Sequence, residues 1–306
     1  MEDTACAPHA MHITPVEEGA RVRDYIELLK PRVMSLVVFS GLVGLMVAPG
    51  HIHPLLGVIT ILCIAASAGG SAAVNMWYDR DIDAIMTRTR RRPLPQGRVA
   101  PQSALEFGST LIFTSVLLMA LAINTLAAVL LAAAAAFYIF VYTMGLKRRT
   151  PWNIVIGGAA GAFPPVIGWA AVTGQVALPA IVLFLIIFFW TPPHFWALAL
   201  YRNEDYRLAN VPMLPVMKGE RRTKIEMLLY TLVLFPLSLM PAYTGIAGNA
   251  YLIGAAVLSM LFIICALRVL RDKTHRSARQ MFLFSLFYLT ALFVILLADQ
   301  AMKAVP

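Results

Sequence analysis

Long apolar stretches alternate with short polar connections along most of the chain. The stretches are continuous and do not alternate with polar residues, which favours helices over the strands of a membrane barrel. Each is about 20 residues long, enough to cross ~30 Å of hydrocarbon. Nine such runs cover residues 33–49, 55–77, 103–122, 125–145, 153–172, 178–200, 225–243, 249–267 and 281–300. The pattern therefore predicts an all-α polytopic membrane protein with nine transmembrane helices.

The composition agrees with this pattern. Hydrophobic residues make up 59% of the chain and charged residues 13%, whereas soluble domains carry about 25% charged residues. The net charge of +9 would suggest nucleic acid for a soluble protein, but here we expect no nucleic-acid partner, because the charges follow membrane topology. The three cysteines form no CxxC pair, so neither a zinc site nor a redox pair is indicated.

The polar connections fall into two classes. Four of them, "PGHIHP", "INT", "VTGQVA" and "AYTGIAGN", contain no Lys or Arg. The other connections and the segment before the first run hold 24 of the 25 basic residues, with Lys303 as the exception. The positive-inside rule makes this basic side cytoplasmic. We therefore expect a multi-pass protein of the cell inner membrane, with a cytoplasmic N-terminal tail over 1–28, a transmembrane domain over 29–306 and the C-terminus outside.

The acidic residues show the same asymmetry. Fifteen of the sixteen lie in the tail, in the basic connections or near the cytoplasmic ends of the runs, and Asp299 is the exception. An ion-coupled transporter or proton relay usually needs an ionisable group near the bilayer midplane. The absence of such a group from the sequence disfavours that class of function.

A knot of carboxylates stands at the end of the second run, in "NMWYDRDID". Asn75, Asp79 and Asp83 are spaced i, i+4, i+8, so they lie along one face of a helix and its extension, whereas Trp77 points the other way. One carboxamide and two carboxylates suit Mg²⁺, which takes few protein ligands and completes its shell with water and phosphate oxygens. The alternative is a solvated helix end whose carboxylates pair with nearby arginines.

A second acidic patch, Glu204 and Asp205, follows the sixth run on the same side of the membrane. Two such patches suit two cations around one diphosphate. Basic side chains that bind phosphate also lie on this side, and the alternative is that they set topology and bind anionic lipid headgroups. The candidates for the diphosphate are Arg32, Arg88, Arg90, Lys147, Arg148 and Arg207. A diphosphate that belongs in a bilayer would carry a prenyl chain.

A histidine stands inside an apolar run, in "FFWTPPHFWALAL". Two prolines precede His194, so we expect a kink and freed backbone carbonyls. Taken alone, the side chain is interpreted as a buried histidine bonded to such a carbonyl. The aromatic side chains near these motifs are Trp77, Tyr142, Phe195 and Trp196.

These motifs resemble those of a known family. "NMWYDRDID" is similar to the NxxxDxxxD signature of the UbiA superfamily of intramembrane prenyltransferases. The finer resemblance is to its heme O synthase subfamily, through "LLKPRVMSLVVFSGLVG", "NMWYDRDIDAIMTRTRRRPLPQG", "YTMGLKRRTPWNIVIGGAAGAFPPVIGW", "WTPPHFWALAL" and "DYRLANVPMLPV". Close relatives typically read Lys-Asp-Asp-Tyr where this chain has Asn203, Glu204, Asp205 and Tyr206. Either Glu204 or Asp205 is therefore a candidate metal ligand.

The resemblance implies a fold and a reaction. The fold would be nine helices around a central cavity that opens to the cytoplasmic side. The farnesyl group of farnesyl diphosphate would be joined to a vinyl group of heme b, with water supplying a hydroxyl, and Mg²⁺ would assist. A heme A synthase or an oxidase assembly factor would be the downstream partner.

The resemblance also implies roles for residues. Asn75, Asp79, Asp83 and Lys147 would be catalytic, and the first three would hold metal with Glu204 and Asp205. His194 and Trp196 would bind heme. Tyr142, Trp77 and Phe195 would line the prenyl pocket. Two other classes stay open: the same fold with an aromatic acceptor of quinone biosynthesis, and a non-enzymatic transporter or assembly factor.

Overall fold

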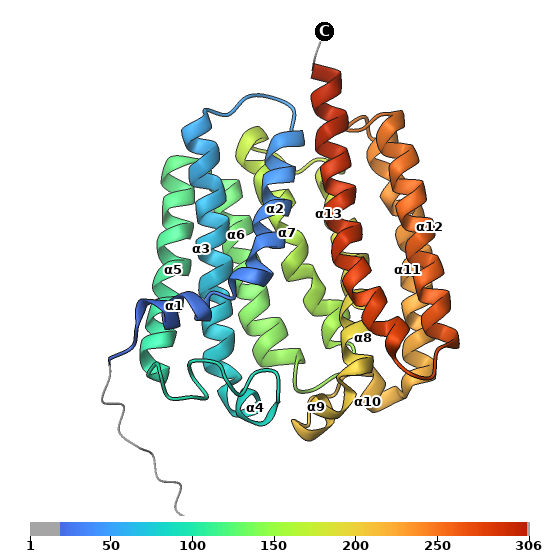
Figure 1. The fold of residues 1–306 in the computed structure, drawn as a ribbon. Coiled ribbons are helices and arrows are strands. Elements are labelled where there is room, and N and C mark those ends of the chain that lie inside the picture. Colours follow the sequence, from blue (N-terminus) through green and yellow to red (C-terminus); the bar gives the residue numbers. More distant parts are fainter. Residues whose placement is uncertain (1–18, 305–306) are drawn as a thin grey trace, which may run out of the picture.

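The computed structural model describes residues 19–304, and within that range it contains helices and no strands (Figure 1). The helices are α1 (Val22–Leu28), α2 (Pro31–Val47), α3 (Pro54–Tyr78), α4 (Arg80–Ile85), α5 (Pro101–Ala122), α6 (Thr125–Ala136), the π-helix η1 (Phe137–Leu146), α7 (Asn153–Thr173), α8 (Leu178–Tyr201), α9 (Asn203–Leu208), α10 (Leu214–Lys218), α11 (Glu220–Tyr243), α12 (Asn249–Arg271) and α13 (Arg276–Ala304). The prediction of an all-α fold is confirmed.

The long helices account for the predicted spans. Eight helical segments of the described chain are long and apolar enough to cross a membrane, with α6 and η1 forming one of them. The helices α1 and α2 meet at a bend of 57°, and counting this bent pair as one crossing gives nine. The chain is therefore a multi-span membrane protein, as its apolar pattern indicates.

The bend between α1 and α2 has a local cause. Pro31 is the first residue of α2, where its missing N–H and fixed φ are tolerated, but a proline disfavours the helical conformation in the residue before it. Lys30 adopts the left-handed region instead, with φ of 52°. The expected tail over 1–28 thus ends in a helix, and residues 1–18 lie outside the described range.

An ion-pair cluster fixes α1 to the rest of the bundle. Asp24 is buried and pairs with Arg98, from the connection between α4 and α5. The same guanidinium lies 2.8 Å from Glu27 and also donates to the main-chain carbonyl of Arg91. The start of the first crossing is therefore held against the connection that follows the carboxylate motif.

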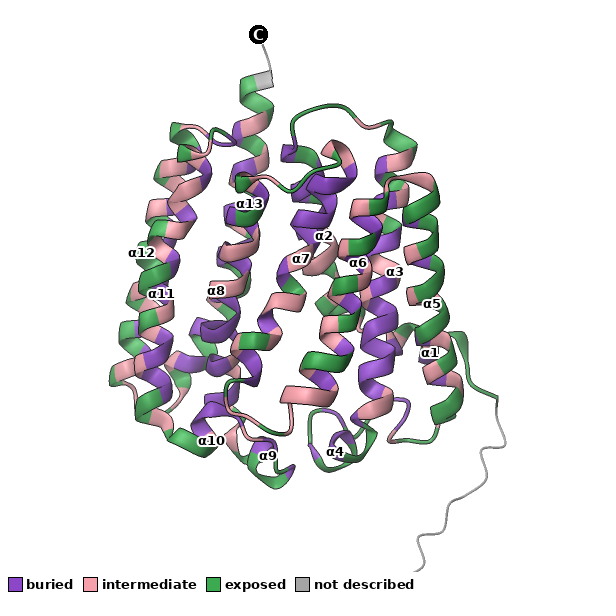
Figure 2. Cartoon of the chain, turned by 180° about the vertical axis from the view of Figure 1, so that it is seen from behind, coloured by how far each residue is buried: buried purple, intermediate pink, exposed green. Residues whose placement is uncertain are grey.

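The helices α7 and α8 form the middle of the bundle (Figure 1). On one side, α2 packs on α7 and α3 packs on α5; on the other, α11 and α13 pack on α8, and α12 packs on α11 and α13. In the most apolar 18-residue window of α7 and of α8, 61% of residues are buried, against 22% for α5. Figure 2 shows the exposed residues concentrated on the outer helices. Side chains on α7 and α8 therefore face protein far more than lipid.

Small residues let α2 approach α7 closely. A Cβ added at Gly44 would overlap the main-chain carbonyl of Pro165, and one added at Gly168 would overlap that of Gly41. Lipid gives little hydrophobic drive for helices to associate, so close backbone packing of this kind supplies much of the attraction. These two contacts fix α2 against α7 along its middle.

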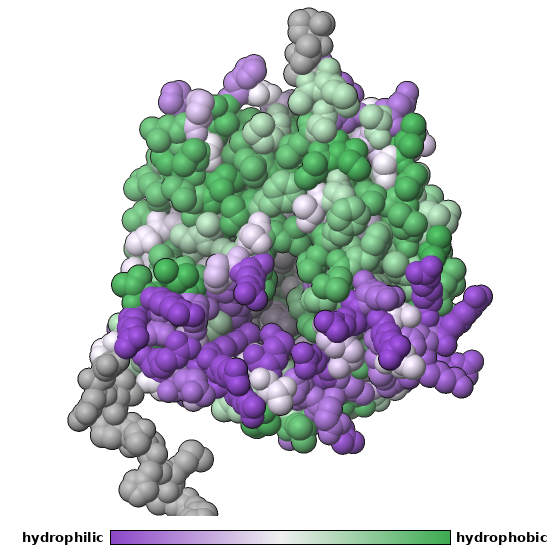
Figure 3. Space-filling view, viewed as in Figure 1, coloured by the Kyte–Doolittle hydropathy of each residue, from purple (hydrophilic) through white to green (hydrophobic). Residues whose placement is uncertain are grey.

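The surface is divided into an apolar band and one strongly polar end (Figure 3). The polar end, called the charged end below, carries α4, α9 and α10, while α13 runs to the opposite end (Figure 1). Figure 3 also shows the surface hollowed between α2 and α13, next to the charged end. Further along α2, the two helices meet through Phe39 and Phe293, whose ring centroids are 6.5 Å apart.

Candidate active site

The carboxylate motif lies at the charged end, where α3 passes into α4. Asn75, Asp79 and Asp83 are all buried, with exposed fractions of 3%, 0% and 3%. Asp79 separates the two helices, yet its N–H bonds to the Asn75 carbonyl at 2.9 Å, and the Asp83 N–H bonds to the Asp79 carbonyl at 2.8 Å. This main-chain pattern continues the helical spacing across the break. The Asn75 side chain donates to Asp79 Oδ2 at 2.7 Å, so the structure brings these two residues together.

Two basic residues from the segment after η1 meet this motif. Lys147 forms a salt bridge with Asp79 through Nζ. The Arg148 guanidinium lies 3.4 Å from Asp79 Oδ1, and it holds both carboxylate oxygens of Asp81 at 2.6 and 2.7 Å. Hydrogen bonds from Arg148 lower the pKa of Asp81 below its ordinary value. Lys147 thus pairs with the buried carboxylate of Asp79, whereas Arg148 binds mainly the exposed carboxylate of Asp81.

A π-helix places Lys147. The Lys147 N–H bonds to the Tyr142 carbonyl at 2.8 Å, five residues back. The Thr143 hydroxyl donates to the Tyr138 carbonyl at 2.8 Å and accepts from Asn75 Nδ2 at 3.2 Å. Such wider turns occur mostly as short segments, frequently at functional sites. The apolar run over 125–145 predicts a helix here but carries no signal for its wider turn.

Lys30 belongs to the same cluster, although the sequence pointed to its neighbour Arg32. Lys30 Nζ donates to Asn75 Oδ1 at 2.7 Å, and the charges of Asp79 and Asp83 act on it. Arg32 is exposed on the first turn of α2. The one available signal was a lysine directly before a proline at the start of an apolar run, in "LLKPRV".

Asp83 is bound by the connection that follows α4. Arg92 Nη1 lies 2.6 Å from Asp83 Oδ2, and the Thr89 hydroxyl donates to the Asp83 carbonyl at 2.9 Å. Of the predicted diphosphate ligands in this connection, Arg90 is exposed and Arg88 is hydrogen-bonded to Tyr206. The arginine that reaches Asp83 is therefore Arg92, and neither Arg88 nor Arg90.

The same connection reaches the second acidic patch. The Thr87 hydroxyl lies 2.6 and 2.7 Å from the two carboxylate oxygens of Asp205, which is buried. Glu204 is exposed and pairs with Arg207 at 2.8 Å. The structure therefore ties Asp205, and not Glu204, to the connection that also holds Asp83.

The donor set fits a magnesium ion that is shared with a phosphate. Asp79, Asp83 and Asp205 offer buried carboxylates at one end of the bundle, and Asn75 adds a carboxamide oxygen. Among the described residues, no three His, Cys, Asp or Glu side chains converge into a complete metal site. Mg²⁺ usually keeps several waters and binds through one or two carboxylates plus substrate phosphates. These residues suit that partial coordination.

The candidate aromatic residues divide between two places. Tyr142 and Phe195 pack in one cluster with Ile82 and Tyr206, beside the carboxylate motif. A Cβ at Gly157 would overlap the Tyr142 ring, so a glycine is needed where this ring packs on α7. The structure thus places aromatic rings and apolar side chains next to the charged groups.

Trp77 and Trp196 lie apart from that cluster. Trp77 packs with Tyr25 and Phe107, on the α1 and α5 side of α3. Trp196 is fully buried and meets the edge of Tyr230, on α11, with ring centroids 5.5 Å apart. Neither indole is brought to the carboxylates.

His194 lies between α8 and α13, and it is 7% exposed. Its ring is stacked between Trp190 and Phe282, with centroid separations of 4.4 and 4.7 Å. Its Nδ1 lies 2.6 Å from the Ser285 hydroxyl. The expected bond to a freed backbone carbonyl is not present among the described residues, and a side chain of α13 takes that place.

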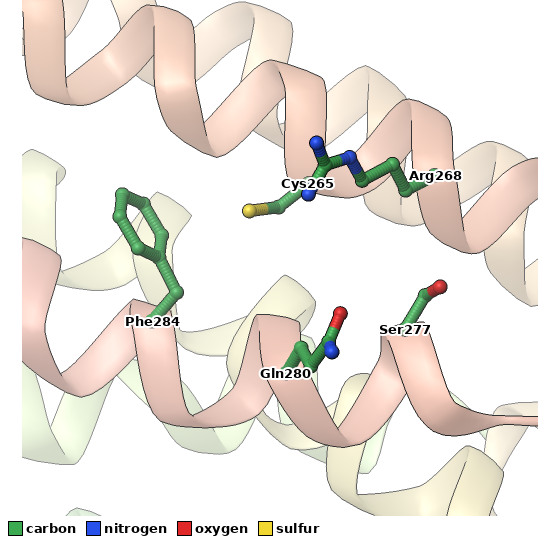
Figure 4. A pocket seen from close by; sticks show the side chains of 5 residues that line it. All are labelled: Cys265, Arg268, Ser277, Gln280 and Phe284. Atoms are coloured by element: carbon green, nitrogen blue, oxygen red, sulfur yellow. The ribbon is translucent and has the colours of Figure 1, made fainter.

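A separate cavity lies between α12 and α13 and has a volume of about 320 Å³ (Figure 4). The residues that line it are Cys265, Arg268, Ser277, Gln280 and Phe284. None of the predicted site residues borders it. It is therefore distinct from the carboxylate cluster.

Comparisons with known proteins show the family and the fold of this chain. The model of the UbiA prenyltransferase family matches residues 37–291. The protoheme IX farnesyltransferase of Agrobacterium fabrum is 56% identical over 296 residues, which cover 94% of this chain and 93% of that protein. A solved structure of digeranylgeranylglyceryl phosphate synthase covers 92% of this chain and 99% of its own, with a TM-score of 0.77 at 20% identity. A UbiA homolog from Archaeoglobus fulgidus bound to GPP and Mg²⁺ covers 89% and 99%, with a TM-score of 0.63 at 18% identity. The two structures establish a shared fold.

Proposed function

The chain belongs to the UbiA prenyltransferase family, and from this premise we propose that it transfers the farnesyl group of farnesyl diphosphate to a vinyl group of heme b. Water supplies the hydroxyl group of the product, which is heme O. The observation that carries this proposal is the 56% identity with the Agrobacterium fabrum protoheme IX farnesyltransferase, which extends over 94% of this chain. The family membership expected from "NMWYDRDID" is confirmed, and so is the prediction of a prenyltransferase.

The diphosphate is assigned to the carboxylate cluster. Asn75, Asp79 and Asp83 would hold one magnesium ion, and Asp205 would hold a second with or without Glu204. Bound there, Mg²⁺ would neutralise charge on the departing diphosphate. The UbiA homolog with bound GPP and Mg²⁺ supports a divalent metal for the family. In this chain, Lys147 and Asp79 are already paired, so a phosphate can take the lysine while the carboxylate turns to metal.

Basic side chains would stabilise the leaving group. Lys147, Arg148 and Lys30 surround Asn75 and Asp79, and Arg92 reaches Asp83. Preorganised cations aimed at developing negative charge lower the barrier to bond breaking. Arg32, Arg88, Arg90 and Arg207 lie outside this inner set and would attract the anionic substrate towards the charged end.

Bond breaking leaves the electron pair of the C–O bond on the diphosphate and a cation on the first carbon of the farnesyl group. Tyr142 and Phe195 line the adjacent cluster, where aromatic faces can stabilise that cation and exclude water. The π electrons of the heme vinyl group then form the new C–C bond. A water molecule supplies the hydroxyl to the porphyrin-side cation and loses a proton.

The heme is assigned to the space beside His194. His194 lies about 10 Å of helix before the end of α8 at Tyr201, and Asp205 follows on α9, so a porphyrin beside His194 would lie deeper in the bundle than the diphosphate. Trp196 faces the opposite side of α8, so its predicted part in heme binding would be indirect. Trp77 likewise faces away from the proposed prenyl pocket.

The membrane placement completes the proposal. The protein would lie in the cell inner membrane with its charged end facing the cytoplasm, from which Mg²⁺ and the diphosphate group can reach the site. The C-terminus would lie on the outer side. The heme O product carries a long apolar chain and would pass within the membrane to a heme A synthase or an oxidase assembly factor.

Purified protein incubated with heme b, farnesyl diphosphate and Mg²⁺ tests the function. Mass spectrometry of the porphyrin should show a gain that matches one farnesyl group plus one hydroxyl group, and EDTA should prevent that gain. A parallel incubation offers an aromatic acid of the quinone-precursor type as the acceptor. Prenylation of that acid, with heme left unchanged, would reject the heme proposal while keeping the prenyltransferase assignment.

A further inference from the structure

The surroundings of His194 are built by two contacts from α13. Trp190 Nε1 donates to the main-chain carbonyl of Ser285 at 2.8 Å, which fixes the height of α13 against α8. The Ser285 hydroxyl lies 2.6 Å from His194 Nδ1. Ser285 is fully buried, and rings cover both faces of the imidazole. The imidazole is therefore held by stacking and by a single polar neighbour.

The hydroxyl proton of Ser285 is already committed. Ser285 Oγ donates to the main-chain carbonyl of Phe282, with an O–O distance of 2.6 Å. A serine hydroxyl has one proton to donate and two lone pairs that accept. If that proton goes to the carbonyl, the hydroxyl can only accept from His194. Nδ1 must then carry the imidazole proton, and the lone pair of the neutral ring stands on Nε2.

Helix periodicity shows which way His194 faces. Trp190 faces α13, and Thr191 packs against Gly158 of α7. His194 follows them by four and three residues, so it lies between these two directions. Figure 3 shows the surface hollowed between α2 and α13, and α7 and α8 lie behind that opening (Figure 1). His194 Nε2 has no hydrogen-bond partner among the described residues, and it is not fully enclosed.

We propose that Ser285 is a positioning residue that fixes His194 as the Nδ1–H tautomer and so presents Nε2 as the base that ligates heme iron. The part of this inference that concerns iron rests on the proposed function. A ligand histidine almost always donates its second ring N–H to a carboxylate, a carbonyl or water, and this partner sets the tautomer and the ring orientation. In this chain a serine hydroxyl, made an obligate acceptor by the Phe282 carbonyl, takes that part.

The tautomer can be measured without heme. In protein labelled with ¹⁵N-histidine, the two ring nitrogens of His194 give different chemical shifts, and the signal is assigned by its loss in His194→Gln. We expect a protonated Nδ1 and an unprotonated Nε2 in the wild-type chain and in Ser285→Thr, which keeps the hydroxyl. Ser285→Ala should shift the population towards protonated Nε2. A protonated Nε2 in the wild-type chain would overturn the inference.

Heme binding provides the second arm. Titration followed by the Soret band should show ~10-fold weaker binding in Ser285→Ala, within the range found when outer partners of metal ligands are removed, and recovery in Ser285→Thr. Ser238→Ala is the matched control, since Ser238 is also buried and contacts α13 through the Tyr288 hydroxyl at 2.6 Å. Equal heme affinity in Ser285→Ala and wild type would contradict the positioning role.

The two arms separate this inference from the proposed function. If wild-type protein binds no heme but farnesyl diphosphate binds normally, the proposed function fails and the iron ligation fails with it. The tautomer measurement then still decides the role of Ser285. If heme binds and is farnesylated while His194 carries its proton on Nε2, the function stands and the inference falls.

Discussion

The Thr87 hydroxyl lies within 2.7 Å of both carboxylate oxygens of Asp205, across 118 residues of sequence. Its neighbour Thr89 bonds to the main chain of Asp83. One short connection therefore spans the two acidic patches and sets their separation. In the proposed function, the distance between the two acidic patches would have to match a diphosphate, so this connection would act on the geometry of the site.

Thr87→Ala removes the only hydroxyl that the described structure places on Asp205. We expect the KM for farnesyl diphosphate to rise ~10-fold, because a buried polar group left without its partner costs about 1–3 kcal/mol. Heme affinity from Soret titration should not change. Thr87→Ser is the control and should behave as wild type. A normal KM in Thr87→Ala would show that the two patches act independently.

Asp79 and Asp81 form a matched pair that differs in burial. Asp79→Ala leaves Lys147 without its carboxylate inside the cluster, so we expect transfer to fall by at least ~10²-fold while membrane insertion is kept. Asp81 is 61% exposed on its side chain and should tolerate Ala with a small loss. Activity is measured as heme O formed per minute, and insertion by membrane fractionation. Turnover of Asp79→Ala near the wild-type rate would remove Asp79 from the site.

Asp205 and Glu204 also differ in burial, and we expect their substitutions to differ in effect in the same way. Asp205→Asn is expected to weaken the binding of Mg²⁺, raising the Mg²⁺ concentration for half-maximal rate by ~10-fold or more. Glu204→Gln should leave that concentration unchanged, because Glu204 pairs with Arg207 on the exposed side. Mg²⁺ titrations at saturating substrate measure this. The reverse ranking would assign the metal to Glu204.

Substitutions at Lys30 and Arg32 test whether the binding of farnesyl diphosphate depends on the position of a basic side chain or on its charge alone. Lys30→Met removes the hydrogen bond to Asn75 and a cation next to the carboxylates, so binding of farnesyl diphosphate should weaken ~10-fold. Arg32→Met removes an exposed cation of the same sign and should weaken binding less, with the loss fading at high salt. Equal losses in the two variants would mean that general attraction of the anion explains both.

Gly157 and Gly161 lie one turn apart on α7 and differ in what surrounds them. Gly157→Ala forces the Tyr142 ring to move, at a cost of about 1–3 kcal/mol, and should lower farnesyl transfer relative to diphosphate release. A Cβ at Gly161 meets nothing within 4 Å, so Gly161→Ala should keep wild-type melting temperature and turnover. Unchanged turnover in Gly157→Ala would separate Tyr142 from the reacting cation.

Much of the fold can be predicted from the hydrophobic pattern, because lipid requires continuous apolar helices of one length. The carboxylate spacing likewise predicts the contact between Asn75 and Asp79, since main-chain bonds continue across the break. The departures occur where helices are interrupted. The left-handed Lys30 and the wide turn that places Lys147 depend on packing between helices, which hydropathy does not report.

The basic and aromatic candidates were harder to choose from sequence. The connection after α4 holds five arginines that the sequence does not rank, and only the folded connection shows that Arg92 reaches Asp83. Helix phase carried more information than residue type for the indoles. Trp77 is two residues from Asn75 and Trp196 two from His194, so each lies on the opposite side of its helix.

The glycine contacts between α2 and α7 bear on how large substrates would enter. With backbone against backbone at Gly44 and Gly168, α2 cannot tilt away from α7 without losing many contacts at once. Across the opening, α2 contacts α13 less extensively than it contacts α7, and the rings of Phe39 and Phe293 are part of that contact. Aromatic side chains can rotate aside where packed main chains cannot. We therefore expect that α13, the helix that carries Ser285, moves when a large substrate enters through this opening. The helix α2 is expected to stay fixed against α7.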